Sequence, residues 1–140
     1  MIQVNTTSKD MAKYTNNVKV ALKNGCQWIQ LRMSASSDAD FVNVASSIKE
    51  LCDEYHAYLI IEDHVHLVKQ VKANGVLLNK ESLIRAARKE LGARYLICMN
   101  AADQQTACRY KELGADCTNE DNLGYKMFEM EVGAPHVAYA

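Results

Sequence analysis

The stretch with the clearest chemical potential is Trp28-Ile29-Gln30-Leu31-Arg32, an apolar run whose last residues become polar and cationic. Buried strands normally end in turn residues, whereas a glutamine and an arginine stand one residue apart at the end of this one. In parallel α/β folds, the carboxyl ends of strands are where binding and catalytic side chains collect. Gln30 and Arg32 therefore predict a row of hydrogen-bond donors that faces a ligand. A salt bridge of Arg32 at the rim of the sheet is the simpler alternative.

A second group of ionisable side chains follows another apolar run, at residues 62–66. Glu62, His64 and His66 alternate there, and all three are residue types that bind zinc. We expect a helix to begin at this point, however, and residues two apart on a helix point in different directions. This disfavours a transition-metal site. Asp63 immediately precedes the expected helix, so it fits a helix N-cap, a role that does not exclude metal binding.

Two further patterns have simpler interpretations. Four basic residues lie close together in the sequence: Arg85, Arg88, Lys89 and Arg94. They fit a solvated helix face, with anion binding at the start of a helix near Ser82 as the alternative. The order of serine, cysteine, histidine and aspartate residues matches no arrangement that favours covalent catalysis.

The bulk composition fits one domain that spans residues 1–140. The chain is 49% hydrophobic and 24% charged, with a net charge of −1. That balance argues against nucleic acid and acidic membrane surfaces as partners, and the chain contains no apolar run long enough for a membrane span. The N-terminus starts directly in a strand-like pattern, so we expect no signal peptide. Five cysteines without CxxC spacing fit core positions in a reducing cytoplasm better than disulfides or a zinc site.

The elements that must position these residues alternate along the chain. Strand-like runs begin near residues 2, 28, 58, 76, 95, 116 and 136, and amphipathic helix patterns separate most of them. Four of the helical segments finish at a glycine shortly before the next strand, which is typical of βα units on a parallel sheet. After Asp116 no helix pattern is evident. The fold class that this predicts is an incomplete (β/α)8 barrel with about seven parallel strands.

Several segments, in this order, resemble thiamin-phosphate synthase and the related thiazole tautomerase. They are residues 25–32 (GCQWIQLR), 51–67 (LCDEYHAYLIIEDHVHL), 73–83 (ANGVLLNKESL) and 113–116 (LGAD). The resemblance covers nearly the whole chain. It implies a compact barrel of thiamin biosynthesis, a transferase that joins a phosphorylated thiazole to a pyrimidine diphosphate with loss of pyrophosphate. It also implies Mg²⁺ as the cofactor.

The resemblance assigns substrate-binding roles to residues at strand ends. Gln30 and Arg32 match the pair that helps to hold the pyrimidine diphosphate in the family. Ser34 stands where the family has a lysine, and Glu62 replaces an amide that meets the substrate. Asn100 stands at a family serine.

For the metal, Asp63 matches one aspartate ligand, and Ser82 stands at the position of a second, lost ligand. The T-x-T-K segment of the family has no clear counterpart here, although Lys126 lies near its position. The phosphate-binding Gly-Gly turn should follow Val137-Ala138, where Tyr139 and Ala140 stand instead, and an eighth strand is missing. The chain is thus expected to be a divergent, C-terminally shortened member of the family.

These departures lead us to expect reduced or no synthase activity, because transition-state stabilisation commonly loses about 3 kcal/mol with each missing donor. The ligand remains a small phosphorylated heterocycle. A non-catalytic barrel-derived binding or scaffold protein is the alternative. A seven-stranded open sheet would have edges at its first and seventh strands, and we expect residues 119–133 or a second subunit of a homo-oligomer to cover them.

Overall fold

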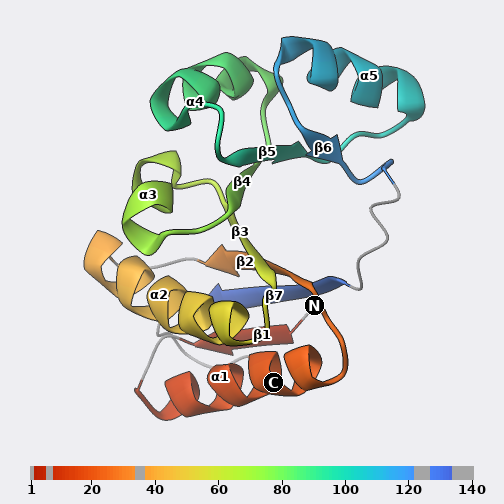
Figure 1. Ribbon diagram of the computed structural model, residues 1–140. Helices are drawn as coiled ribbons and strands as arrows, with labels where there is room; N and C mark the ends of the chain where they lie inside the picture. The colour runs from red at the N-terminus through yellow and green to blue at the C-terminus, as the bar shows by residue number, and fades with distance from the viewer. Residues whose placement is uncertain (1, 6–7, 34–36, 122–126, 134–140) are drawn as a thin grey trace.

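A computed structural model describes residues 2–5, 8–33, 37–121 and 127–133. Its seven strands form one sheet in the order β1-β7-β2-β3-β4-β5-β6, and every neighbouring pair is parallel. The strands are β1 (Ile2–Asn5), β2 (Trp28–Met33), β3 (Tyr58–Glu62), β4 (Gly75–Leu78), β5 (Leu96–Met99), β6 (Cys117–Thr118) and β7 (Met127–Gly133). The α-helices are α1 (Ser8–Lys23), α2 (Asp38–Glu54), α3 (Val68–Val71), α4 (Ile84–Leu91) and α5 (Gln104–Leu113). The predicted α/β class with about seven parallel strands is confirmed (Figure 1).

The first six strands begin within one residue of their predicted starts. The seventh does not. We expected it at residues 135–140, which lie outside the described residues, whereas β7 spans Met127–Gly133. The alternation of polar and apolar residues in Met-Phe-Glu-Met-Glu-Val is a strand pattern that the sequence analysis overlooked.

The position of β7 also corrects the expected sheet edges. It pairs with β1 through Ile2 and Met130, and with β2 through Leu31 and Met130. The sheet therefore ends at β1 and β6, so the prediction of an edge at the seventh strand was wrong. Residues 127–133 fill the interior of the sheet instead of covering an edge.

The alternation of side chains along the strands divides the core between two faces of the sheet. Ile29, Leu31, Leu59 and Ile61 are fully buried and pack with the apolar faces of the helices. The opposite face is smaller and carries its own apolar cluster of Trp28, Ile60, Leu77, Cys98 and Cys117. Gln30, Arg32 and Glu62 extend this second face toward the carboxyl ends of β2 and β3.

The residues at the helix starts show which side chains cap a helix and which do not. Ser37 caps α2, because its side chain accepts a hydrogen bond from the Asp40 amide at 3.1 Å. Short 3₁₀ turns at Val65–Leu67 and Glu81–Leu83 precede α3 and α4. His64 is the N-terminal boundary residue of the first of these turns and makes no side-chain cap, so the interpretation of Asp63 as an N-cap was wrong. No helix within the described ranges has the length and apolar character needed to cross a bilayer.

Candidate functional site at the carboxyl ends of β2, β3 and β4

An ion pair between Arg32 and Glu62 is the centre of the candidate site. Because Leu31 and Ile61 are paired in register, the next residues of β2 and β3 stand side by side on one face of the sheet. Arg32 Nη2 donates to Glu62 Oε1 at 3.0 Å, and Arg32 Nε contacts Glu62 Oε2. The Glu62 side chain is only 8% exposed, whereas that of Arg32 is 47% exposed. The salt bridge that was the simpler interpretation of Arg32 is therefore present.

Asn79 joins this pair to Asp63. It follows β4 directly, and its Nδ2 donates to Glu62 Oε1 at 3.0 Å and to Asp63 Oδ2 at 3.2 Å. Asp63 is exposed, and both Asp63 and His64 have left-handed backbone conformations, with φ of 55° and 54°. Such conformations cost about 1–3 kcal/mol per residue outside glycine and recur at binding sites. The turn after β3 thus presents the Asp63 carboxylate beside the buried Glu62.

The two nearby histidines have separate partners. The His64 ring stacks on Phe41 with centroids 4.3 Å apart, and its Nδ1 lies 3.2 Å from the Glu62 carbonyl oxygen. His66 Nε2 lies 3.1 Å from Asp38 Oδ2. Across the described part of the chain, no three histidine, cysteine or acidic residues are grouped as metal ligands. The geometry gives the zinc hypothesis no support.

Two adjacent cavities open on the same face of the sheet. The smaller, of about 70 Å³, is lined by Gln30, Arg32, Glu62 and Asn100, together with Glu129 of β7 and apolar neighbours. With its amide nitrogen toward β7, Gln30 donates to Glu129 Oε1 at 3.0 Å and accepts from Trp28 Nε1 at 3.2 Å. The larger cavity, of about 140 Å³, shares Gln30, Asn100 and Glu129 and continues toward β6. The structure therefore brings four of the predicted substrate-binding residues to one hollow.

The other predicted site residues do not join this hollow. Ser34 lies outside the described residues. Ser82 is exposed in the 3₁₀ turn before α4 and lines neither cavity. Sequence reasoning missed Asn79 and Glu129. The position of Asn79 directly after a strand was the available signal, whereas Glu129 required recognition of β7.

Asp121 lines the larger cavity, and its carboxylate is bound by a lysine side chain and by a backbone amide. Lys111 Nζ donates to its Oδ1 at 2.5 Å, and the Thr118 amide donates to its Oδ2 at 2.9 Å. These two donors lower the pKa of the Asp121 carboxyl group, with Lys111 the larger cause. The wall therefore carries a negative charge that is already neutralised by Lys111.

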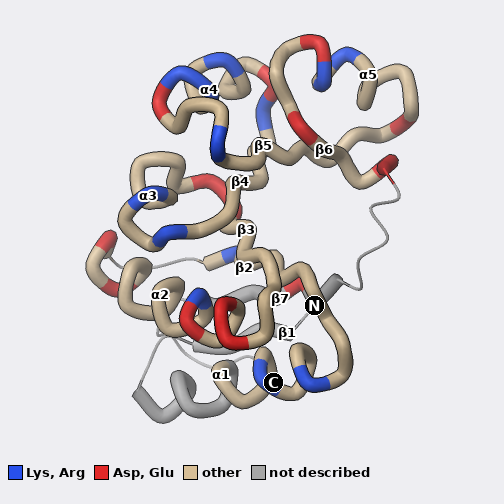
Figure 2. The backbone as a smooth tube through the Cα atoms, viewed as in Figure 1, with Lys and Arg blue, Asp and Glu red and all other residues tan. Residues whose placement is uncertain are grey.

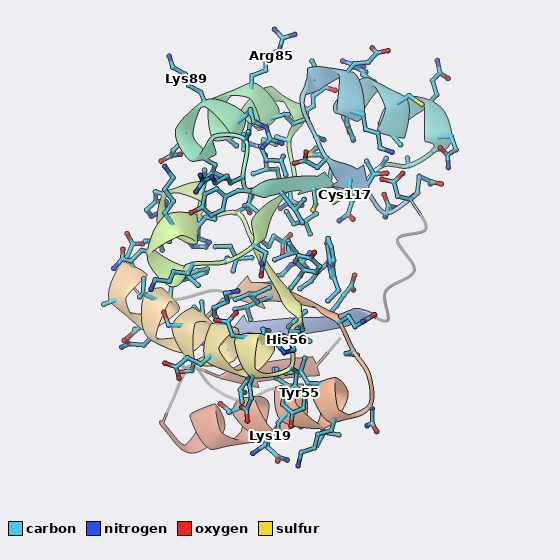
Figure 3. The ribbon with its side chains drawn as sticks, viewed as in Figure 1. Lys19, Tyr55, His56, Arg85, Lys89 and Cys117 are labelled. Carbon is cyan, nitrogen blue, oxygen red and sulfur yellow. The ribbon has the colours of Figure 1, made fainter. Side chains whose placement is uncertain are left out.

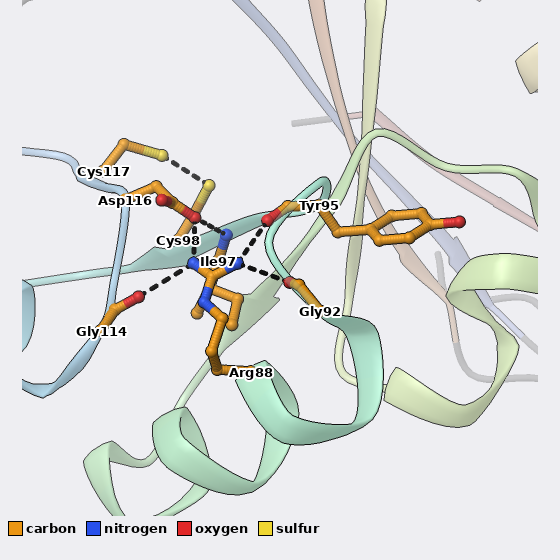
Figure 4. Close-up of polar contacts among 8 residues, drawn as sticks. All are labelled: Arg88, Gly92, Tyr95, Ile97, Cys98, Gly114, Asp116 and Cys117. Carbon is orange, nitrogen blue, oxygen red and sulfur yellow. Dashed lines mark hydrogen bonds and ion pairs between the residues drawn. The ribbon is translucent and has the colours of Figure 1, made fainter.

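The basic residues of α4 have two different environments. Arg88 binds other parts of the protein, whereas Arg85 and Lys89 point outward. The Arg88 guanidinium donates to the carbonyl oxygens of Gly92, Tyr95 and Gly114 at 2.8–2.9 Å and pairs with Asp116 (Figure 4). Arg85 and Lys89 project away from the body of the protein (Figure 3). Basic and acidic residues lie together on this helix (Figure 2). This arrangement supports the interpretation of a solvated helix face.

Comparison with known proteins places these residues in a family context. A family model described as thiamine monophosphate synthase matches residues 2–119. A thiamine-phosphate synthase of Bacteroides fragilis is 35% identical over 116 residues, which are 82% of this chain and 57% of that protein. One of Flavobacterium psychrophilum is 36% identical over 121 residues, covering 81% of this chain and 59% of the relative. The chain thus spans less than two thirds of the length of these relatives.

The fold has a matching solved structure as well. The thiamine phosphate pyrophosphorylase from Pyrococcus furiosus superposes with a TM-score of 0.69 at 20% sequence identity. The superposition covers 94% of this chain and 74% of the other. At this identity the likeness establishes the fold, which is of the (β/α)8 barrel type and incomplete here.

Proposed function

The chain belongs to the thiamine monophosphate synthase family, and from that premise we propose that it binds a phosphorylated pyrimidine or thiazole of thiamin biosynthesis with reduced or no synthase activity. The binding site is the hollow beside Gln30, Arg32, Glu62 and Asn100. Ser34, which lies outside the described residues, stays a proposed substrate-binding residue that replaces the family lysine. The observation that carries the proposal is the bidentate contact between Arg32 and Glu62.

The reason is electrostatic. Departure of pyrophosphate concentrates negative charge on the leaving group, so catalysis requires positive charge that is free to stabilise it. The Arg32 guanidinium is already paired with a carboxylate that is 8% exposed. A substrate pyrophosphate must compete with Glu62 for that guanidinium, and the same carboxylate repels it. The pairing of Arg32 with Glu62 therefore weakens catalysis more than it weakens binding of the heterocycle.

A magnesium ion fits the site only with help from the ligand. Mg²⁺ is commonly held by one or two carboxylates together with substrate phosphates and waters. Asp63 would supply an exposed carboxylate, and Ser82 supplies no charge at the position of the second family ligand. When bound, the ion would neutralise part of the pyrophosphate charge. We therefore propose that Mg²⁺ binds together with the diphosphate and weakly without it.

The proposal also covers the cellular location and the oligomeric state of the protein. We place it in the cytoplasm as a homo-oligomer in which a second copy covers an edge of the sheet, β1 or β6. The alternative function is a non-catalytic scaffold that has kept the barrel architecture without a ligand.

Thiamin phosphate formation and binding of the pyrimidine diphosphate, measured on the purified full chain, test the proposal. We expect little or no turnover, with Mg²⁺-dependent binding that is lost in Asp63→Ala. Asp38→Ala is the matched control, because Asp38 is an exposed carboxylate that pairs with His66 on another element. Normal turnover that depends on Asp63 would overturn the claim of reduced activity. Absence of any Mg²⁺-dependent binding would favour the scaffold.

A further inference from the structure

Two cysteines face each other across the last pair of strands. Cys98 of β5 and Cys117 of β6 are partners in register, and their Sγ atoms lie 2.6 Å apart (Figure 4). Both are buried, with 3% and 6% of their surfaces exposed. All five cysteines of the chain are free thiols in the structure, and these two form a hydrogen-bonded pair.

The strand geometry permits a covalent link between them. Neighbouring strands lie about 4.7–4.9 Å apart, within the roughly 4.4–6.8 Å that a disulfide spans between Cα atoms. The sulfur atoms must approach by about half an ångström more to reach a bond length of about 2.05 Å. β6 has only two residues and lies at the edge of the sheet, so a small shift there disturbs few other contacts.

The two thiols also differ in acidity. The hydrogen bond from Cys98 lowers the pKa of Cys117, whereas this bond and burial raise the pKa of Cys98. Cys117 also lies on the edge strand β6 and is the more exposed of the two, so we expect it to be the nucleophile. Cys52 provides a contrast within the chain, since burial raises its pKa to about 12.

A small oxidant has a route to the pair. Both residues line the cavity of about 140 Å³, which also contains Gln30 and Asn100. A water molecule occupies about 30 Å³ of liquid volume, so this cavity has room for a molecule as small as hydrogen peroxide. The cysteines that pack on the helix face, Cys26 and Cys52, do not line it.

We propose that Cys98 and Cys117 are a redox modification site, which hydrogen peroxide converts to a reversible disulfide between β5 and β6. The Cys117 thiolate attacks one peroxide oxygen and breaks the O–O bond, and the departing hydroxide takes up a proton to form water. The Cys117 sulfenic acid is then attacked by the Cys98 sulfur, which loses its proton as a second water leaves. Two thiols are oxidised and one peroxide is reduced to two waters. An added thiol reverses the link by exchange.

This site is independent of the proposed ligand. It depends on two side chains and one cavity wall, and its readout is covalent. Oxidation would alter the cavity wall near Gln30 and Asn100, whatever molecule occupies the hollow.

Peptide mapping of the full-length chain carrying Cys108→Ser tests the proposal. This background removes the exposed thiol that shares a tryptic peptide with Cys98. After peroxide treatment, we expect a linked pair of peptides, residues 95–109 with 112–126, that dithiothreitol separates. The link should disappear in Cys98→Ala and Cys117→Ala and persist in Cys52→Ala.

A second measurement identifies the nucleophile. In Cys98→Ser a hydroxyl can still donate to Cys117 but no resolving thiol remains, so dimedone should label Cys117 in folded protein. Cys98 in the matched variant Cys117→Ser should be labelled less. Peroxide treatment that leaves both thiols of the parent reduced would overturn the proposal. So would links that join Cys98 to Cys26 or Cys52 as often as to Cys117, because these would require loss of the native sheet.

Discussion

Glu62 decides the electrostatic character of the candidate site. Its carboxylate accepts from both Arg32 and Asn79 on the face of the sheet where Gln30 and Asn100 also lie. A group this buried is retained only when it is well paired, because desolvation of an unpaired charge costs several kcal/mol. Glu62 therefore fixes the orientation of the Arg32 guanidinium. At the same time, it takes up hydrogen-bond donors of that guanidinium that would otherwise face a ligand.

Glu62→Gln should strengthen the binding of inorganic pyrophosphate by about tenfold, because a charge-assisted pair worth about 1.5 kcal/mol no longer competes for Arg32. Isothermal titration calorimetry with and without Mg²⁺ measures the change. Glu81→Gln is the matched control, since it removes the same charge from an exposed pair with Arg109. Equal gains in the two variants would indicate a general effect of net charge and contradict the role of Glu62.

At the residue scale, sequence reasoning predicted which side chains lie together where strand register alone determines their positions, and their role in binding stays a prediction. Gln30, Arg32, Glu62 and Asn100 were all predicted as site residues. Gln30 lies in the middle of β2, and the other three lie close to the carboxyl ends of their strands. Their adjacency follows from the parallel register. The role of Asp63 as a cap was mispredicted because its backbone is left-handed, a conformation that sequence propensity does not predict for an aspartate followed by a histidine.

Gly75 is the element-scale position with the strictest steric requirement. It begins β4 and pairs with Leu96 of β5, and a Cβ at Gly75 would overlap the Leu96 carbonyl oxygen. Gly75→Ala should therefore destabilise the fold by about 1–3 kcal/mol or more by forcing the two strands apart. Urea unfolding measures the loss.

Gly25→Ala is the comparison for this experiment. Gly25 has φ of 93° but no atom within 4 Å of an added Cβ, so only conformational strain of about 1–2 kcal/mol is expected. If Gly75→Ala proves no more costly than Gly25→Ala, close approach of β4 and β5 is not the constraint.

The connection between β6 and α5 should depend on pH through Asp121. Its folded-state pKa is lowered by Lys111 and the Thr118 amide, so the ionised form is favoured by folding. That stabilisation is complete above the ordinary aspartate value of about 3.9 and is lost as the pH falls through the lowered value. The melting temperature of Asp121→Asn should thus lie below that of the parent at pH 7, and the gap should shrink below about pH 4.

Lys111→Met gives the control for this pH dependence. Without the ammonium group, the Thr118 amide remains as the only donor to Asp121 in the described structure, so the loss of stability on acidification should be smaller. An unchanged pH profile would show that Lys111 does not set the behaviour of Asp121.

Sequence periodicity predicted most elements of the fold but not the order of its strands. The first six strands alternate with helical segments, so each connection predicts the next neighbour in the sheet. β7 follows β6 without an intervening helix among the described residues, and it pairs with β1 and β2. Its neighbours are determined by long-range pairing, which local pattern does not predict.

For the whole molecule, the edges of the sheet formed by the described residues predict association. β1 and β6 each have one strand neighbour among the described residues, and unpaired strand edges favour contact with another chain. We expect light scattering to give a mass that is a multiple of 15.7 kDa for the purified protein. The mass of a single chain at micromolar concentration would contradict the homo-oligomer.

The insertion of β7 between β1 and β2 has a consequence for folding during synthesis on the ribosome. Among the described residues, the strand that pairs with β1 is β7, which is more than a hundred residues further along the chain. The strands from β2 to β6 can assemble progressively as they emerge, because β3, β4, β5 and β6 each pair with the strand synthesised just before them. Of the described strands, β1 is thus the first to be synthesised and the last to gain its partner, which is made more than a hundred residues later.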